Sequence, residues 1–161
     1  MAALNRADLI QIVDEEFRQL VKRVNVDGHL TVWGDYGVTT VRIHNRHAPI
    51  LSDLRLGTVL SLYDSAAGRI FLAYQERERT DAVLKFEVSH MEEQKPSEKD
   101  IQTIVEKVRH DGYAWIDGQV FRGFRAIAAP IFDPQGKLQA AMSLVSNQPS
   151  LVRFPNSTLD D

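Results

Sequence analysis

The 161-residue sequence contains no cysteine, which excludes disulfide bonds, thiol catalysis and Cys-ligated metals. It also lacks an uninterrupted apolar run close to the roughly 20 residues that span a bilayer. The first residues, MAALNRADLIQ, have no apolar core of the length that a secretory signal needs. These absences favour a cytoplasmic protein without a membrane segment.

A surplus of basic residues is missing as well, because 22 Asp and Glu outnumber 19 Lys and Arg. The net charge of −3 has the wrong sign for a surface that grips phosphates unaided, so we expect no direct contact with nucleic acid. With 43% hydrophobic residues, a chain of this length buries a core without a metal or a disulfide. We therefore expect a globular fold with neither metal nor cofactor.

The spacing of apolar residues divides the chain into helices and strands. A period of three to four residues predicts helices over 8–24, 64–74, 80–88 and from Ser97 to Gly112. Alternation and turn residues predict strands around 30–32, 41–43, 113–116, 124–132 and 138–145, with a hairpin at the run Asp133-Pro134-Gln135-Gly136. We expect an N-terminal amphipathic helix in 1–25, the main domain in 26–146, a long connection over 45–58 and an irregular tail in 147–161.

Titratable residues do not gather in a catalytic spacing. The acidic run 14–16 lies among basic residues on the first predicted helix, which favours a solvated face. His44 and His47 lie at a strand end where a three-residue spacing points them to opposite sides, so surface histidines are favoured over a metal pair. His29 follows a turn and has no visible partner in the sequence. We expect no catalytic or metal-binding residues.

The start of the helix over 64–74 is the most informative feature. The run Asp64-Ser65-Ala66-Ala67-Gly68 combines N-cap residues with side chains too small to cover the free backbone N–H groups of a helix N-terminus. Such a terminus suits a carboxylate or another anion. Close packing of this helix on the small-residue strands near the C-terminus explains the same residues equally well, so both interpretations stay open.

Four sequence blocks carry a family resemblance. In order they are 57–74 (GTVLSLYDSAAGRIFLAY), 108–114 (VRHDGYA), 123–136 (GFRAIAAPIFDPQG) and 140–143 (AAMS), and together they resemble the effector-binding domain of IclR-type bacterial transcriptional regulators. The resemblance implies an α+β, GAF-like fold: a curved antiparallel sheet with helices packed on its faces and a small-molecule pocket. It also implies a homodimer or homotetramer in which a separate winged helix-turn-helix domain, absent from this chain, binds operator DNA.

The resemblance further implies an effector that is an organic acid. The backbone amides of Ala66 and Ala67 correspond to positions that bind the effector's carboxylate, and Ser143 to one that offers a hydroxyl. Leu60 and Phe124 correspond to apolar walls. The expected ligand-binding residues are Leu60, Ser65, Ala66, Ala67, Gly68, Ile116, Phe124, Ala126, Ser143 and Val145.

Several positions depart from the family members that bind small acids. Ile116, Ala126 and Val145 are apolar where a carboxylate, a thiol and a second serine can occur. A carboxylate anchor beside a more apolar wall suits a larger or aromatic acid better than a two- or three-carbon oxoacid. The family also usually closes with an amphipathic helix, whereas 146–161 lacks helical periodicity and contains two prolines.

Two functions of other classes stay open. One is a small α+β enzyme that uses the same pocket, with Asp117, Tyr113 or His110 as acid or base, although no titratable set converges. The other is a ligand-free dimerisation domain in which the small residues serve packing alone and the helix over 8–24 forms the dimer. Ligand-dependent stabilisation without turnover would distinguish a sensor from both.

Overall fold

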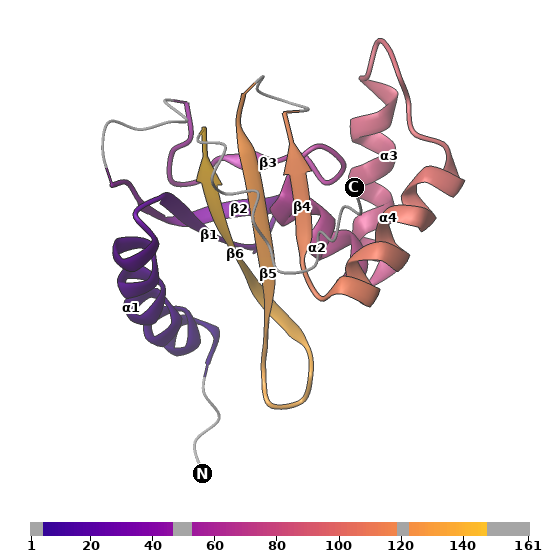
Figure 1. The fold of residues 1–161 in the computed structure, drawn as a ribbon. Coiled ribbons are helices and arrows are strands. Elements are labelled where there is room, and N and C mark those ends of the chain that lie inside the picture. Colours follow the sequence, from indigo (N-terminus) through magenta and orange to yellow (C-terminus); the bar gives the residue numbers. More distant parts are fainter. Residues whose placement is uncertain (1–4, 47–52, 119–122, 148–161) are drawn as a thin grey trace.

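The computed structural model describes residues 5–46, 53–118 and 123–147. In these residues six strands form one curved antiparallel sheet in the order β3-β2-β1-β6-β5-β4, with four helices packed on it (Figure 1). The expected α+β architecture is therefore confirmed. The helices are α1 (Arg6–Val24), α2 (Ala66–Tyr74), α3 (Arg77–Ser89) and α4 (Glu98–Asp111), and the strands are β1 (Asp27–Gly34), β2 (Gly37–His44), β3 (Val59–Leu60), β4 (Ala114–Asp117), β5 (Arg125–Phe132) and β6 (Leu138–Ser146).

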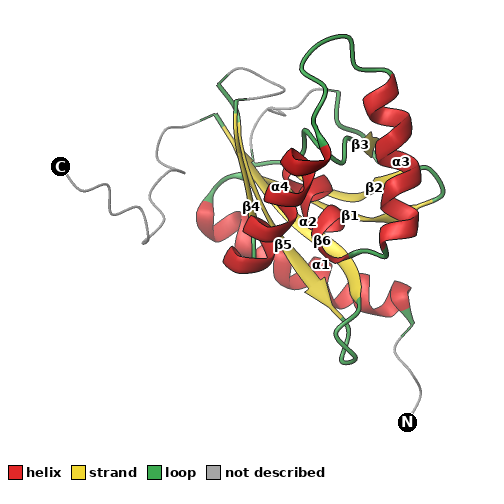
Figure 2. Cartoon of the chain, turned by 90° about the vertical axis from the view of Figure 1, so that its right-hand side faces the viewer, coloured by secondary structure: helices red, strands yellow, loops and turns green. Residues whose placement is uncertain are grey.

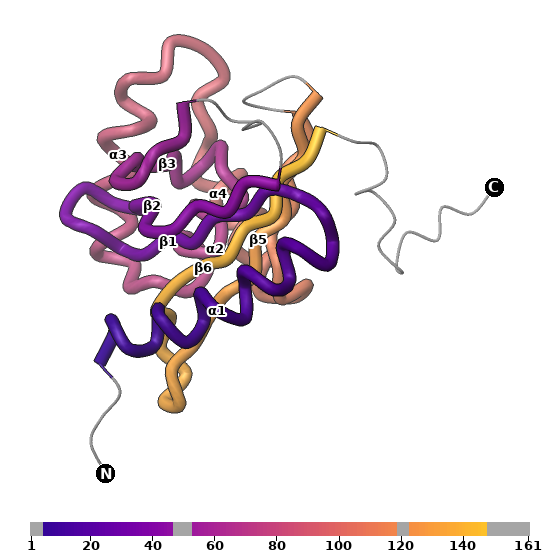
Figure 3. Tube along the Cα trace, turned by 90° about the vertical axis from the view of Figure 1, so that its left-hand side faces the viewer, coloured from indigo at the N-terminus to yellow at the C-terminus, as the bar shows by residue number. Residues whose placement is uncertain are grey.

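Helix α1 covers one face of the sheet. Phe17 and Val21 of α1 are buried against Leu30 of β1, and Met142 and Leu144 of β6 pack beside them. Figure 3 shows α1 lying across β1 and β6. Because this apolar stripe recurs at helical spacing, the predicted first helix is confirmed, and its apolar side faces the sheet.

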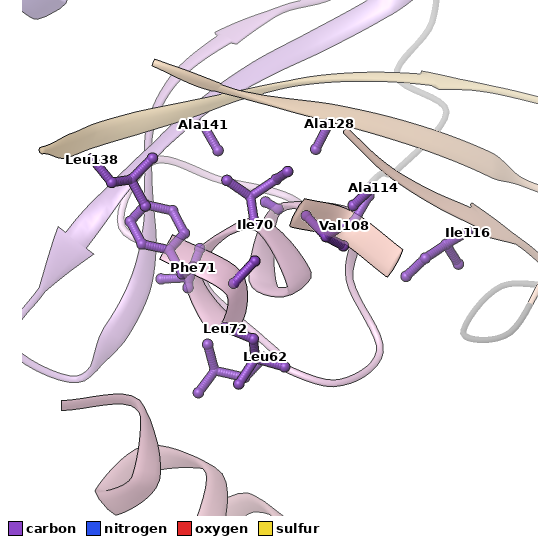
Figure 4. Packing of buried hydrophobic residues seen from close by; sticks show 14 residues of the cluster. Leu62, Ile70, Phe71, Leu72, Val108, Ala114, Ile116, Ala128, Leu138 and Ala141 are labelled. Atoms are coloured by element: carbon purple, nitrogen blue, oxygen red, sulfur yellow. The ribbon is translucent and has the colours of Figure 1, made fainter. Parts of the chain in front are cut away.

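Helix α2 is the central helix of the opposite face. Ile70 and Phe71 are fully buried and pack with Ala128 of β5 and Ala141 of β6 (Figure 4). The small strand side chains let α2 lie close to the sheet, as the sequence predicts. Helix α4 packs against α2 through Val108, and Figure 2 shows α2, α3 and α4 together on this side of the sheet.

The helix ends follow their sequence signals. Ser65 is the N-cap of α2, and its side chain accepts a hydrogen bond from the Gly68 amide at 2.8 Å. Ser97 and Asp100 form a reciprocal capping box at the start of α4, and Gly112 ends that helix in the left-handed conformation with φ 78°. Helix α4 begins where the sequence predicts, and α2 begins two residues after the predicted start at Asp64, because Ser65 rather than Asp64 caps the otherwise unpaired amides.

The Ser97→Ala variant should lower the free energy of unfolding by about 1 kcal/mol, because the first turn of α4 loses its side-chain acceptor. Urea denaturation measures this loss. The matched control is Ser97→Thr, which keeps the hydroxyl and should remain within about 0.5 kcal/mol of the parent protein. Equal losses in the two variants would contradict the capping role.

Two helices start earlier than their apolar spacing predicts. Helix α1 begins at Arg6 because the Asn5 side chain accepts a hydrogen bond from the Asp8 amide and caps the helix. Helix α3 begins at Arg77 rather than near residue 80, since its first turn is charged and exposed and carries no apolar signal. Within the predicted connection and tail, residues 47–52 and 148–161 lie outside the described residues. The division at residues 25 and 146 stays a prediction.

Candidate functional site

A cavity of about 270 Å³ lies between the sheet and the segment that leads from β3 into α2. Its wall is largely apolar and draws on β1, β3, α2, β4, β5 and β6. Nine of the ten residues selected from the sequence line it: Leu60, Ser65, Ala66, Ala67, Ile116, Phe124, Ala126, Ser143 and Val145. These residues are far apart in the sequence, and the curved sheet brings them together around one space.

Gly68 is the residue of that set that does not line the cavity. A Cβ atom at this position would lie far inside van der Waals contact of the Ser61 carbonyl oxygen and 2.6 Å from Leu62 Cα. Gly68 therefore lets the β3–α2 segment pack directly on the first turn of α2. Backbone packing therefore accounts for the glycine at this position, and a contact of Gly68 with a ligand stays a prediction.

Six further residues line the cavity and were not selected from the sequence: His29, Leu54, Val59, Ser61, Asp64 and Arg125. Four of them directly neighbour selected residues and lie inside the family blocks, so including the immediate neighbours of each selected residue would have found Val59, Ser61, Asp64 and Arg125. His29 comes from the first strand, and only the pairing of β1 with β6 places it opposite Ser143. No pattern in the sequence predicts that β1 pairs with β6.

The N-terminus of α2 opens on the cavity. The Ser65 hydroxyl has no donor left for a ligand, because it donates to the Ser61 carbonyl at 2.6 Å and already accepts from the Gly68 amide at 2.8 Å. The amides of Ala66 and Ala67 precede the first intrahelical hydrogen bonds, and no acceptor for them lies among residues 5–46, 53–118 and 123–147. Two backbone donors therefore remain at the cavity wall.

Glu87 of α3 holds the segment in front of α2. Its carboxylate accepts hydrogen bonds from the Leu62 amide at 2.9 Å and the Tyr63 amide at 3.3 Å, and the Ser61 hydroxyl also donates to it. The same Ser61 oxygen accepts from the Asp64 amide at 2.8 Å. Helix α3 therefore sets the position of one cavity wall, although Glu87 itself does not line the cavity.

Three ionisable side chains line the cavity. Burial lowers the pKa of His29 to about 4, so its imidazole is neutral at pH 7. Burial also raises the pKa of Asp64; the charge of Glu87 acts in the same direction and that of Arg69 opposes it. Arg125 is paired with Asp117, with Nε and Oδ1 3.0 Å apart. The deep part of the wall near β1 and β6 therefore carries no charge.

His44 and Asp14 correct the expectation of solvated side chains. The His44 Nε2 and Asp14 Oδ1 atoms are 2.7 Å apart, and both side chains are three-quarters or more buried between α1 and β2. Arg42 Nε lies 3.7 Å from the other oxygen of Asp14. The sequence could not show this contact because it joins positions 30 residues apart. His47 lies outside the described residues.

The residues considered for catalysis do not line this cavity. Asp117 is half-exposed and paired with Arg125, His110 is exposed beside Asp111, and Tyr113 follows α4. Across the described part of the chain, no group of three His, Asp or Glu side chains is arranged to hold a metal ion.

A larger hollow of about 560 Å³ between α3 and α4 mixes charged and apolar side chains. Neither of the two buried unpartnered hydroxyls in the described residues faces it.

No helix within 5–46, 53–118 and 123–147 is long and apolar enough to cross a membrane.

Several known proteins resemble this chain in sequence and fold. The HTH-type transcriptional regulator KdgR of Escherichia coli K12 is 25% identical over 148 residues, which are 88% of this chain and 55% of that protein. The crystal structure of the KdgR C-terminal domain aligns with a TM-score of 0.71 at 25% identity, covering 91% of this chain and 84% of that one. The structure of Pseudomonas aeruginosa HmgR aligns with a TM-score of 0.78 at 22% identity, covering 89% and 56% of the two chains, and shares the fold.

The present chain thus spans about half the length of the full-length KdgR that it matches. The family model described as bacterial transcriptional regulator IclR C-terminal matches residues 1–158. Because this match covers nearly the whole chain and agrees with the fold, the protein belongs to the family of IclR C-terminal domains of bacterial transcriptional regulators.

Proposed function

We propose that this chain is the effector-sensing part of a bacterial transcriptional regulator and that its cavity binds a small organic acid. A separate helix-turn-helix domain outside this chain binds operator DNA, and the acid changes the operator affinity of a homodimer or homotetramer. Membership of the family and the name of KdgR as an HTH-type regulator support the regulatory role.

The N-terminus of α2 carries the proposal of an acidic ligand. The amides of Ala66 and Ala67 lack acceptors among the described residues, and they lie at the positive end of a helix dipole. Independently, the Ser143 hydroxyl on the same cavity wall is buried without a hydrogen-bond partner in the described part of the chain. A carboxylate supplies acceptors for all three donors.

The rest of the wall indicates the kind of acid. Ile116, Ala126 and Val145 present apolar surface, and Phe124 and Leu60 extend it. A two- or three-carbon oxoacid would leave most of this surface uncovered, whereas a benzoate or phenylacetate would bury it. The proposed effector is therefore an acid with a sizeable apolar body.

A binding panel tests the proposal. Thermal unfolding and titration calorimetry are measured with benzoate, phenylacetate, pyruvate and glyoxylate. We expect saturable binding and stabilisation by one of the larger acids without any product formation. Preferential binding of pyruvate or glyoxylate would overturn the apolar-acid proposal, and turnover of a bound acid would support the enzyme alternative instead.

The Ala67→Val variant places two methyl groups beside the amides at the cavity wall. It should weaken binding of the strongest acid of the panel by about 10- to 100-fold, the equivalent of about 1–3 kcal/mol of overpacking. Calorimetry measures the affinity, and circular dichroism checks the fold. The exposed position Ala82 of α3 supplies the control Ala82→Val, which should bind as the parent does. Unchanged affinity in Ala67→Val would contradict the α2 site.

A further inference from the structure

His29 and Ser143 form a pair of polar side chains at the cavity wall. They are direct partners in the register of β1 with β6, and both line the cavity. Both are buried, with exposed fractions of 6% and 1%. Because opposite residues in an antiparallel pair have Cβ atoms about 4.5–5.5 Å apart, one small group of a ligand can contact both side chains.

Neither side chain has a hydrogen-bond partner within residues 5–46, 53–118 and 123–147. The other two hydroxyls of the wall differ, since Ser61 and Ser65 are engaged in the turn before α2. A ligand that offers no hydrogen-bonding group here leaves a buried polar side chain unpaired. It loses about 1–3 kcal/mol of binding free energy for each such side chain. The cavity therefore favours a ligand with a polar group at this point.

The hydrogen-bonding capacity of the pair defines that group. His29 is neutral at pH 7 because burial lowers the pKa of its imidazole to about 4, so the ring has one N–H donor and one nitrogen acceptor. The Ser143 hydroxyl has one donor and two acceptor sites, so it can donate to the carboxylate and still accept a hydrogen bond from a hydroxyl of the ligand. A hydroxyl group matches both capacities, whereas a second carboxylate accepts only and meets no positive charge from His29.

We propose that His29 is a specificity-determining residue, which together with Ser143 selects an acid that carries a hydroxyl group over the same acid without one. The inference rests on the proposed function, because it assumes that an acid occupies this cavity. It adds His29 of β1, which hydrogen-bonds to a hydroxyl on the body of the acid, while the α2 amides bind its carboxylate.

The cavity volume limits the size of this hydroxy acid. About 270 Å³ lies just below the roughly 300–1,000 Å³ of pockets that bury drug-sized ligands. The cavity therefore suits an acid with a single ring, and such acids exist in pairs that differ by one hydroxyl.

The experiment compares such pairs by calorimetry on the whole chain. The probes are benzoate with its three monohydroxy isomers, phenylacetate with mandelate, and propionate with lactate. We expect one hydroxylated acid to bind about 10- to 100-fold more tightly than its unsubstituted partner, as expected for a matched buried hydroxyl. The position of the favoured hydroxyl then reports its distance from the carboxylate.

Three variants test whether His29 is responsible for the preference for the hydroxylated acid. His29→Leu should bring the favoured pair to within about threefold of each other, because the hydroxylated acid loses a hydrogen-bond partner and the unsubstituted acid no longer leaves an imidazole unpaired. His29→Gln, which keeps a donor and an acceptor, should retain part of the preference. His110→Leu removes an exposed histidine outside the cavity and should retain all of it.

The outcomes separate this inference from the proposed function. Binding of the acids without any hydroxyl preference, or a preference that survives in His29→Leu, overturns the role of His29 and leaves the acid site in place. Failure of every acid in the panel to bind overturns both. A preference that is lost in His29→Leu and partly kept in His29→Gln supports the inference, since a purely structural role would not separate hydroxylated acids from their partners.

Discussion

Acidification from about pH 7.5 to about pH 5 is expected to remove about 2 kcal/mol of folding stability through the single side chain of His29. Burial lowers its pKa from 6.5 to about 4 in the folded protein. Between these two values the unfolded chain binds a proton that the folded chain does not bind. The contribution of His29 is therefore complete above pH 6.5, falls as the pH drops, and has fallen by about 3 kcal/mol near pH 4.

Urea unfolding at the two pH values measures this effect in the parent protein and in two His29 variants. His29→Leu and His29→Gln have no group that titrates at this position, so their stability should fall by about 2 kcal/mol less than that of the parent. The exposed His110 provides the control His110→Gln, which changes the histidine count equally and should follow the parent. Parallel losses in all four proteins would contradict a buried neutral His29.

The Gly68→Ala variant should lose about 3 kcal/mol of stability, although the same change at an exposed helix position gains up to about 1 kcal/mol. The added methyl group meets the Ser61 carbonyl and the Leu62 Cα atom, which belong to the backbone and cannot rotate away. This steric clash is removed only if the segment between β3 and α2 shifts. Glu87 fixes that segment by accepting hydrogen bonds from the Leu62 and Tyr63 amides.

Urea denaturation of Gly68→Ala measures this loss directly. The reverse change at an exposed helix site, Ala82→Gly in α3, calibrates the helix propensity term and should cost about 1 kcal/mol. Because the shifted segment forms a cavity wall, Gly68→Ala should also weaken the acid that binds best to the parent. If the free energy of unfolding of Gly68→Ala equals or exceeds that of the parent protein, the first turn of α2 accommodates a Cβ atom. That result would contradict the close approach seen in the structure.

Local sequence signals predicted the elements that depend on near neighbours. The Ser65 cap and the two ends of α4 at Ser97 and Gly112 each involve hydrogen bonds within a few positions, so short-range sequence signals predicted them. The exposed first turn of α3 escaped prediction, since charged residues carry no apolar period. The family resemblance then located nine cavity residues, because its motif blocks include the turns and strands that surround the cavity.

Contacts between distant residues escaped prediction for a different reason. The contact between Asp14 and His44 joins α1 to β2. The hydrogen bond from the Ser61 hydroxyl to Glu87 joins the segment before α2 to α3. Each depends on how two elements pack, and neither has a spacing that a sequence pattern can show. The close approach of the Ser61 and Leu62 backbone to Gly68 likewise becomes visible only in the packed structure.

By itself, the amino-acid sequence determined an acidic, cysteine-free chain of helices and strands with a capped, small-residue start of α2, because charge, spacing and caps act over short distances along the chain, and the family resemblance added the α+β fold. The tertiary structure alone decided that His29 joins the cavity residues that the family resemblance indicated. The register of β1 with β6 places His29 opposite Ser143, and burial in that position removes the charge of the imidazole. Strand register and desolvation are properties of the assembled sheet, and one residue of slip would have turned His29 to the other face.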